Sequence, residues 1–272
     1  MRKENIISYE QIVPFDFSIV YSELTADSPR NVNDSHIHTE CEIYINVSGD
    51  VSFMVEGHIY PIKSGDIIIT RPYEYHHCIY NSNVLHKHFW ILVKCSGNEH
   101  IFSTFFDRKL GTNNLLSLEE SKKNELIEHC NKMLDLNKSQ TEKYLDFFKF
   151  LSFIEDAKEL SDTEKTYHKD TLYAIKYINQ NYHSRISVSK IAQNAHVSIN
   201  TLERHFQENI KMSPSMYLKR IRLAKAAKLL SSDISVSEAA EKCGFGDYST
   251  FIAEFKKFYG ITPLKYKKDR TN

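Results

Sequence analysis

An internal repeat in the C-terminal third constrains this chain more than any other feature. Two segments, 186–217 and 234–266, run in parallel at an offset of 48 residues that becomes 49 within the repeat. The first segment opens with Ile186-Ser-Val-Ser and the second with Ile234-Ser-Val-Ser. In each copy, apolar residues recur at helical spacing on both sides of a short break. Each copy therefore predicts a short helix, a tight turn and a second helix.

Residues suited to helix ends support this division. Ser187 is placed to cap the first helix of the first copy, and Ser235 opens a capping-box pattern in the second. Gly244 suits the left-handed conformation that ends a helix. Between the copies, Ser213-Pro214 predicts the start of one longer connecting helix, because serine caps and proline fits the first helical position.

A helix–turn–helix unit holds its second helix in the major groove of DNA while its first helix braces the backbone. Two units joined by one stiff helix could place two such helices on one face of a duplex, about 34 Å apart. A helical bundle used for protein contacts is the alternative. Charge favours DNA, because residues 168–272 hold 18 Lys and Arg against 9 Asp and Glu, a net +9. Residues 1–167 hold 17 against 26, a net −9, so the overall charge of zero hides the contrast.

One string covers the second helix of the second copy and its exit. It reads Gly244-Phe245-x-Asp247-x-Ser249-x-Phe251-x-x-x-Phe255-Lys256-Lys257-x-x-Gly260-x-Thr262-Pro263-x-x-Tyr266. The first copy adds Leu202-x-Arg204-x-Phe206. These residues resemble the tandem helix–turn–helix domain of the AraC/XylS transcriptional regulators. The resemblance covers about residues 171–270 and implies an all-α DNA-binding domain over residues 170–272.

The resemblance also implies which side chains contact bases. In the first copy these are Asn200, Thr201, Glu203 and Arg204. In the second copy they are Tyr248, Ser249, Thr250 and Ile252. Arg204 is the strongest candidate because a guanidinium can bridge O6 and N7 of guanine. Asn200 could read adenine and Glu203 could accept from cytosine, although Glu203 could equally be a solvated helix charge.

Further residues at helix starts or on basic faces are placed to contact phosphate, which positions a protein without reading sequence. They are Ser187, Ser189, Lys190, Ser235, Lys256 and Lys257. Two positions depart from the family pattern. Many members carry Arg where this chain has Ala253, which predicts weaker or more degenerate reading by the second copy. Lys211 stands where the second copy has Gly260, so the sequence does not decide the backbone conformation at the end of the first recognition helix.

The N-terminal part has a different pattern. Residues 1–100 contain short runs rich in Ile, Val, Tyr and Phe between turn residues, which predict the closely spaced strands of a barrel or sandwich. Residues 101–160 change to helical spacing and predict a dimerisation or support segment. One of its apolar stripes is Leu145, Phe148, Leu151 and Ile154. The polar stretch 161–169 is the predicted linker.

Eight of the 13 histidines lie between residues 36 and 100. Along a strand, His36, His38 and Glu42 point to one face, and His77 from another strand could complete a site for a divalent metal. The spacing resembles the motifs of metal-binding cupins, although Glu74 stands where glycine is usual. A cupin-type barrel is also the usual N-terminal partner in the regulator family. We therefore expect an α+β multidomain chain, with an N-terminal cupin-like β-barrel and helical dimerisation segment before the all-α tandem helix–turn–helix domain.

The same barrel could hold a small effector instead of a metal. The candidate lining residues are His36, His38, Glu42, Tyr44, His77 and Trp90. Tyr44 continues the parity of Glu42, and Trp90 could stack on a sugar ring. Hydrogen-bonded histidines on a barrel rim, and core packing for Trp90, are the alternatives.

Cysteine use and hydropathy predict the cellular compartment in which the chain works. Five cysteines without a CxxC pair favour a reducing cytoplasm over a disulfide framework. Cys41 and Cys78 are interpreted as packing residues rather than a redox pair. The sequence contains no apolar run of about 18 residues, so it predicts no membrane span. The N-terminus is not followed by the apolar segment of a secretory signal, so we expect none.

The predicted function is that of a cytoplasmic transcriptional regulator, an activator by resemblance, controlled by a small molecule. Its expected partners are double-stranded DNA, the effector, a second copy in a homodimer and, for an activator, RNA polymerase. We expect no catalytic residues. The alternatives are a metal-dependent cupin enzyme or metal sensor fused to a DNA-binding domain, and a regulator whose barrel serves only as a dimerisation scaffold.

Overall fold

The computed structural model describes residues 5–11, 17–25, 38, 40–95, 99–160, 167–232 and 234–271. The chain divides into two compact units, Met1–Lys165 and Thr166–Asn272. The boundary falls in the predicted linker, of which residues 161–166 lie outside the described part. The predicted barrel and the predicted helical segment belong to one unit.

The first unit contains two antiparallel sheets. The larger has the order β1-β2-β8-β3-β6-β9-β10, and the smaller has the order β5-β4-β7. The larger sheet consists of β1 (Asn5–Gln11), β2 (Phe17–Leu24), β3 (Cys41–Ser48), β6 (Ile67–Thr70), β8 (His86–Val93), β9 (Leu115–Ser117) and β10 (Lys158–Glu159). The smaller consists of β4 (Val51–Val55), β5 (His58–Ile62) and β7 (His76–Tyr80).

Alternation along β3 divides the larger sheet into two faces. Ile43 and Ile45 belong to a core shared with the helices, whereas Tyr44 belongs to a second core shared with the smaller sheet. The ring centroids of Tyr44 and Phe53 lie 5.0 Å apart between the two sheets. We call the face that carries Tyr44 the inner face. Cys41 lies in the helical core, opposite Glu42, as the strand parity predicts.

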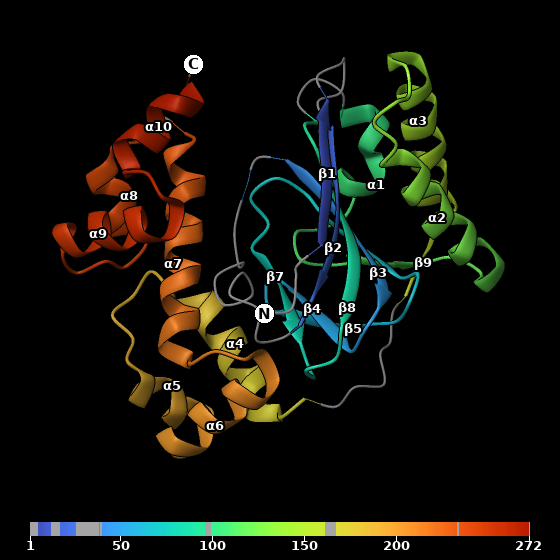
Figure 1. Ribbon diagram of the computed structural model, residues 1–272. Coiled ribbons are helices and arrows are strands. Elements are labelled where there is room, and N and C mark those ends of the chain that lie inside the picture. Colours follow the sequence, from blue (N-terminus) through green and yellow to red (C-terminus); the bar gives the residue numbers. More distant parts are fainter. Residues whose placement is uncertain are drawn as a thin grey trace. The chain divides into compact units, whose positions relative to one another are not determined.

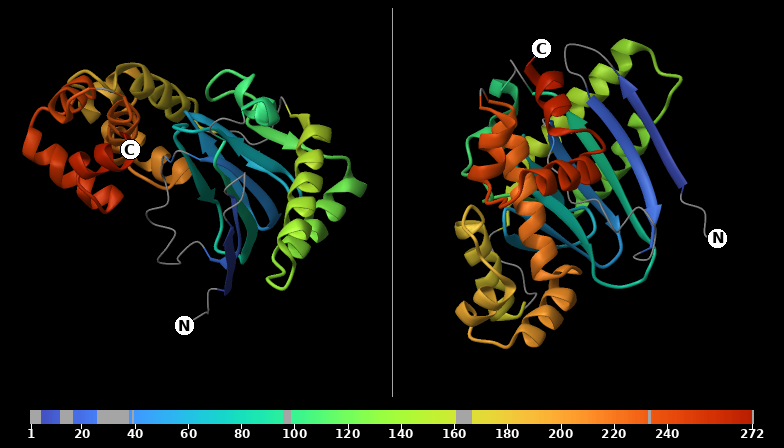
Figure 2. Two further views of the ribbon diagram at one scale, coloured as in Figure 1. Left: turned by 90° about the horizontal axis from the view of Figure 1, so that it is seen from above. Right: turned by 90° about the vertical axis from the view of Figure 1, so that its left-hand side faces the viewer.

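Helices α2 (Glu120–Met133) and α3 (Gln140–Asp156) cover the outer face of the larger sheet (Figure 2). They follow the short helices η2 (Glu99–Phe102) and α1 (Ser103–Phe106). Ser139 begins α3 with a complete capping box, and Phe147 of this helix stacks on Phe17 of β2 with centroids 4.3 Å apart.

The apolar stripe of α3 is divided between two environments. Leu151 and Ile154 are buried, but Leu145 and Phe148 are 65% and 47% exposed. The helix carries apolar residues around most of its circumference, so spacing alone could not choose the buried face. The side chains that face the sheet are Phe147, Phe150, Leu151, Phe153 and Ile154.

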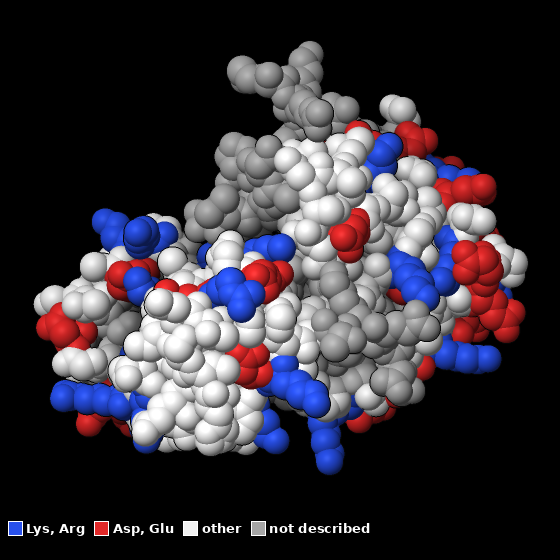
Figure 3. Space-filling model, turned by 90° about the horizontal axis from the view of Figure 1, so that it is seen from below, with Lys and Arg blue, Asp and Glu red and all other residues white. Residues whose placement is uncertain are grey.

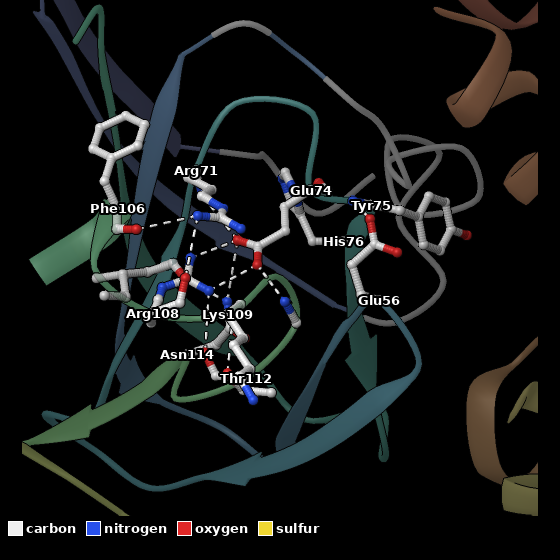
Figure 4. Close-up of polar contacts among 12 residues, drawn as sticks. Glu56, Arg71, Glu74, Tyr75, His76, Phe106, Arg108, Lys109, Thr112 and Asn114 are labelled. Atoms are coloured by element: carbon white, nitrogen blue, oxygen red, sulfur yellow. Dashed lines mark hydrogen bonds and ion pairs between the residues drawn. The ribbon is translucent and has the colours of Figure 1, made fainter. Parts of the chain in front are cut away.

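Glu74, where the cupin resemblance expects glycine, is the centre of a buried polar network (Figure 4). Arg108 donates to both carboxylate oxygens, at 2.7 and 2.5 Å, and the Gly111 amide donates at 2.6 Å. Burial raises the pKa of the Glu74 carboxyl, but the hydrogen bonds and charge of Arg108 outweigh it and hold the pKa below its usual value. The glutamate therefore ties the turn before β7 to the loop at 108–114.

The second unit consists of helices only, among the residues that the structure describes. They are α4 (Lys169–Asn181), α5 (Val188–Asn194), α6 (Ile199–Ile210), α7 (Pro214–Leu230), α8 (Val236–Lys242), α9 (Tyr248–Tyr259) and α10 (Pro263–Thr271). Helix α7 runs through this unit, with α4–α6 gathered at one end and α8–α10 at the other (Figure 1). The predicted tandem helix–turn–helix architecture is confirmed.

The predicted N-cap serines are also confirmed, but the capping box predicted at Ser235 is only half formed, because the Glu238 side chain pairs with Lys242. The Ser187 and Ser235 hydroxyls accept from the backbone amides of Lys190 and Glu238. Ser213 caps α7 in the same way, with Pro214 as the first helical residue. Within the described ranges, every helix is too short or too polar to cross a bilayer.

Candidate functional site

Helix α6 presents a polar outer face. Asn200, Glu203 and Arg204 are exposed, whereas Leu202 and Phe206 point into the core. Thr201 is half-buried, and its hydroxyl lies 2.8 Å from that of Ser198 at the helix start. Three of the four side chains proposed to read bases are thus available to a duplex.

Helix α9 presents Tyr248, Ser249 and Thr250 in its exposed first turn. Ile252, to which the resemblance also assigns a base contact, is half-buried and packs against the core of the second repeat. Ala253 is exposed instead. The exposed first turn of α9 therefore offers two hydroxyls and one phenol, while the partly exposed Glu254 further along the helix is paired with Lys219.

The residues predicted to contact phosphate lie at helix starts or on open surface. Ser187, Ser189, Lys190, Ser235, Lys256 and Lys257 are all exposed. Figure 3 draws one face of the molecule, on which basic and acidic side chains alternate without one large patch of either sign. Helix starts and individual exposed lysines are the candidate backbone contacts.

In the first unit, the inner face brings together His38, Glu42 and His76. The Nε2 atoms of His38 and His76 lie 2.9 and 3.3 Å from Glu42 Oε2. His76, rather than the expected His77, joins this cluster. Consecutive residues of a strand point to opposite faces, so His77 of β7 faces away from it. His36 lies outside the described residues.

Hydrogen bonds to the backbone fix the tautomers of both histidines. Nδ1 of His38 lies 3.0 Å from the Glu40 carbonyl, and Nδ1 of His76 lies 2.7 Å from the Glu74 carbonyl. A carbonyl oxygen only accepts, so each Nδ1 carries a proton. In a neutral ring, Nε2 then directs a lone pair toward the Glu42 carboxylate, which also accepts. Two lone pairs and a carboxylate at this distance call for protons or a metal ion between them.

Deeper along the inner face lie His88 and Asn46, which pair across β3 and β8. Both are buried, and no described residue offers a hydrogen-bond partner to either ring nitrogen of His88 or to the side-chain amide of Asn46. Burial, and secondarily the nearby His86, lowers the pKa of His88 to about 3, so the ring stays neutral. Buried polar groups without partners are rare in folded proteins, so each of these two groups calls for a partner such as a water, an ion or a ligand.

Aromatic rings surround these two polar groups. Tyr44 stacks on His88 at 5.0 Å, and Trp90 meets the edges of both rings at 4.8 and 5.1 Å. Tyr44 and Trp90 were expected from the sequence, whereas Asn46 and His88 were missed. Strand parity offered the signal, because Asn46 continues the series Glu42, Tyr44, and His88 precedes Trp90 by two residues.

Comparisons with known proteins match both units. A family model described as an AraC-like ligand binding domain matches residues 21–105, and one described as a helix-turn-helix domain matches residues 191–269. The chain is 32% identical over 95 residues to the HTH-type transcriptional activator RhaS of Salmonella schwarzengrund, covering 35% of this chain and 34% of that protein. It is 33% identical over 94 residues to an uncharacterised response regulatory protein of Staphylococcus epidermidis, covering 35% and 38%.

Among solved structures, the C-terminal domain of AraT, a response regulator from Geobacillus stearothermophilus, is 28% identical and covers 39% of this chain and 89% of that one, with a TM-score of 0.38. The chain spans about a third of the length of the curated relatives that it matches.

Proposed function

Because this chain belongs to the AraC family of transcriptional regulators, with an AraC-like ligand binding domain followed by a tandem helix–turn–helix domain, we propose that it activates transcription from promoters that it binds through α6 and α9. The observation that carries the proposal is the pair of exposed helix faces, each at the second position of a helix–turn–helix and connected by α7. An activator would also contact RNA polymerase and would work in the cytoplasm.

Binding to DNA is tested by a mobility-shift titration of the full chain on the DNA upstream of its own gene, against a random duplex of equal length. We expect a preference for the upstream DNA and a steep loss of affinity with salt, because phosphate contacts release counterions. Equal affinity for both duplexes at every salt concentration would refute sequence-specific binding.

For the effector, we propose a small, neutral, polyhydroxylated molecule such as a sugar, bound at His88 and Asn46. A neutral imidazole and an amide each offer a donor and an acceptor, and hydroxyl groups can match both. The faces of Tyr44 and Trp90 supply apolar contact beside them. Binding would favour one of two domain arrangements, provided that the effector has different affinities for the two states.

A thermal-shift series with neutral sugars and polyols tests this assignment. The melting temperature of the wild-type chain should rise with ligand concentration, because a ligand bound only to the folded state stabilises it. Asn46→Leu should keep or raise the basal melting temperature, since it removes a buried unsatisfied amide, yet abolish the ligand-dependent rise. An undiminished rise in Asn46→Leu would place the effector elsewhere.

A second candidate function, metal binding, is favoured by the tautomers of His38 and His76. Metal-binding histidines usually donate the other ring N–H to a carbonyl or carboxylate, as both do here. The distances from Nε2 to Glu42 Oε2 suit ligands that share one ion, since neighbouring ligands of a tetrahedral metal lie about 3.3 Å apart. A metal sensor, or a metal-dependent enzyme fused to a DNA-binding domain, would use such an ion.

Elemental analysis of protein purified without added metal or chelator tests the metal site. We expect near-stoichiometric divalent metal in the wild type and in His77→Ala, and its loss in His76→Ala. The two adjacent histidines thus provide a variant and its matched control. Absence of metal from the wild type, or retention in His76→Ala, would leave protonated histidines as the explanation of the cluster.

A homodimer through α3 is supported by Leu145 and Phe148, which are apolar and exposed on one side of this helix. Sedimentation of the full chain should give a dimer, and Leu145→Lys should shift it toward the monomer. Glu155→Lys, another exposed position of α3, is the control. A monomer at all concentrations would refute this interface.

A further inference from the structure

Arg204, the strongest candidate for reading a base, is held at two points. Its Nη1 donates to Glu208 Oε1 at 3.0 Å, and its Nη2 lies 2.9 Å from His205 Nε2. The Arg204 side chain is nevertheless 60% exposed. The guanidinium is therefore oriented from one side while its remaining N–H groups stay available.

The contact with His205 determines the tautomer of that ring. An arginine N–H can only donate, so His205 Nε2 must accept and Nδ1 must carry the proton. Nδ1 in turn lies 2.7 Å from Oδ2 of Asp170, on α4. The side chains of His205 and Asp170 are only 13% and 11% exposed. Asp170, His205 and Arg204 thus form a chain in which each donor meets an acceptor.

Glu208, the second support of Arg204, is fixed by the same region. Its Oε2 lies 3.0 Å from Nε2 of His168, the residue before α4. The backbone amide of His168 donates to Asn209, and the His168 and His205 rings stack at 3.7 Å, almost parallel. The hydrogen bond from Arg204, with a smaller contribution from His168, lowers the pKa of the Glu208 carboxyl.

This cluster differs from the one around Glu42, although both contain two histidines and a carboxylate. At Glu42, lone pairs face a carboxylate and call for protons or a metal ion. In this second cluster, the lone pair of His205 Nε2 faces an N–H group of Arg204, and the Asp170 carboxylate faces the N–H group of His205. The arrangement therefore orients an arginine and does not call for a metal.

We propose that Asp170 and His168, at the start of α4, are positioning residues that set the base preference of Arg204 through His205 and Glu208. The proposal rests on the proposed function, because it assumes that Arg204 contacts a base. A long arginine side chain loses much rotational freedom when it binds, and orienting it beforehand favours the one geometry that is bidentate to guanine. Residues at the junction of the linker and α4 thereby contribute to specificity without touching DNA.

The test uses a duplex selected by the full chain from a randomised library, and variants of it at each base pair. Arg204→Ala identifies the base pair that Arg204 reads, by an expected loss of discrimination of about tenfold. His205→Asn keeps a donor near Asp170 but offers no acceptor at the Nε2 position, and should lose about fivefold of discrimination at that base pair. His205→Gln keeps an acceptor there and should stay within about twofold of the wild type.

Three further variants separate positioning from folding. Asp170→Ala should reproduce the His205→Asn loss, and His196→Asn, at an exposed left-handed turn position that asparagine tolerates, should not. In an Arg204→Ala background, His205→Asn should cause no additional loss of discrimination at that base pair.

Two outcomes would overturn the positioning role alone. One is a loss of discrimination in Arg204→Ala without a loss in His205→Asn, and the other is a His205→Asn loss that persists in the Arg204→Ala background. No effect of Arg204→Ala would overturn the base contact and, with it, this proposal.

Discussion

The two helix–turn–helix motifs reach the same backbone geometry with different residues. The turn after α5 has His196 in the left-handed region at φ 58°, and the turn after α8 has Gly244 there at φ 76°. Both amides donate to the carbonyl three residues before, and the next amide donates to the carbonyl five residues before. The exits repeat the contrast, with Lys211 at φ 57° and Gly260 at φ 75°.

The left-handed conformation at the turn and at the exit is therefore imposed by the helix–turn–helix geometry, whether or not the residue there is glycine. An L-residue in this region costs roughly 1–2 kcal/mol, so the first motif carries strain that the second avoids. The second motif also has one additional turn residue, Gly246, which accounts for the change of offset from 48 to 49. The outer faces differ as well, since α6 presents the oriented Arg204 and α9 presents mainly hydroxyls.

Gly244→Ala should produce the largest effect, a loss of unfolding free energy of about 3 kcal/mol or more. An added Cβ would lie 2.6 Å from the Tyr182 carbonyl oxygen and 2.9 Å from the His183 carbonyl carbon, both of them backbone. His196→Ala at the matching position should cost less than about 0.5 kcal/mol, because a Cβ is already present. Urea unfolding of the full chain measures both, and equal losses would remove the contrast between the turns.

Arg204→Ala should reduce affinity for the selected duplex by about 1–3 kcal/mol, concentrated at one base pair. Thr250→Ala on α9 should cost about 1 kcal/mol or less, since a single hydroxyl offers no bidentate contact. Titrations against single-base variants provide the comparison. A uniform loss across all sequences in Arg204→Ala would mean that this residue contacts phosphate.

Lys211→Gly should stabilise the chain by about 0.5–1 kcal/mol, because relief of the left-handed strain exceeds the added entropy of the unfolded chain. Gly260→Ala should destabilise by about 1 kcal/mol through backbone strain alone, as no atom lies within 4 Å of the added Cβ. Thermal unfolding of both variants checks the opposite signs. A destabilised Lys211→Gly would show that the lysine side chain contributes more than its backbone costs.

The smallest effect concerns the caps of α6 and α9. Ser198 caps α6 with a hydroxyl, whereas Asp247 caps α9 with a carboxylate whose hydrogen bonds to Thr250 lower its pKa. A lowered folded-state pKa adds stability that is complete above the unfolded value, near 4, and is lost as pH falls through the folded value. Asp247→Ser should therefore flatten the pH dependence of stability below about pH 4, and Ser198→Thr should not. An unchanged acid slope in Asp247→Ser would exclude this contribution.

Prediction from sequence succeeded where the signal is local. The caps at Ser187 and Ser235 and the left-handed Gly244 depend on neighbours within one turn, and each is confirmed. Spacing alone did not decide which part of the α3 stripe is buried, because apolar residues lie around most of that helix and only the surface packed against it selects the buried side. The half-buried position of Ile252 likewise depends on the core that it packs against. The exit at Lys211, open in the sequence, has the same left-handed geometry as Gly260.

The sequence by itself determined the tandem repeat, the division into two units and the inner-face parity of Glu42 and Tyr44, because helical and strand periodicity are properties of consecutive residues. Only the tertiary structure decided that His76 joins His38 and Glu42, that Asn46 faces His88, and that Asp170 reaches Arg204 through His205. Those contacts join segments that are distant along the chain. Their partners are chosen by strand register and helix packing, which no local pattern specifies.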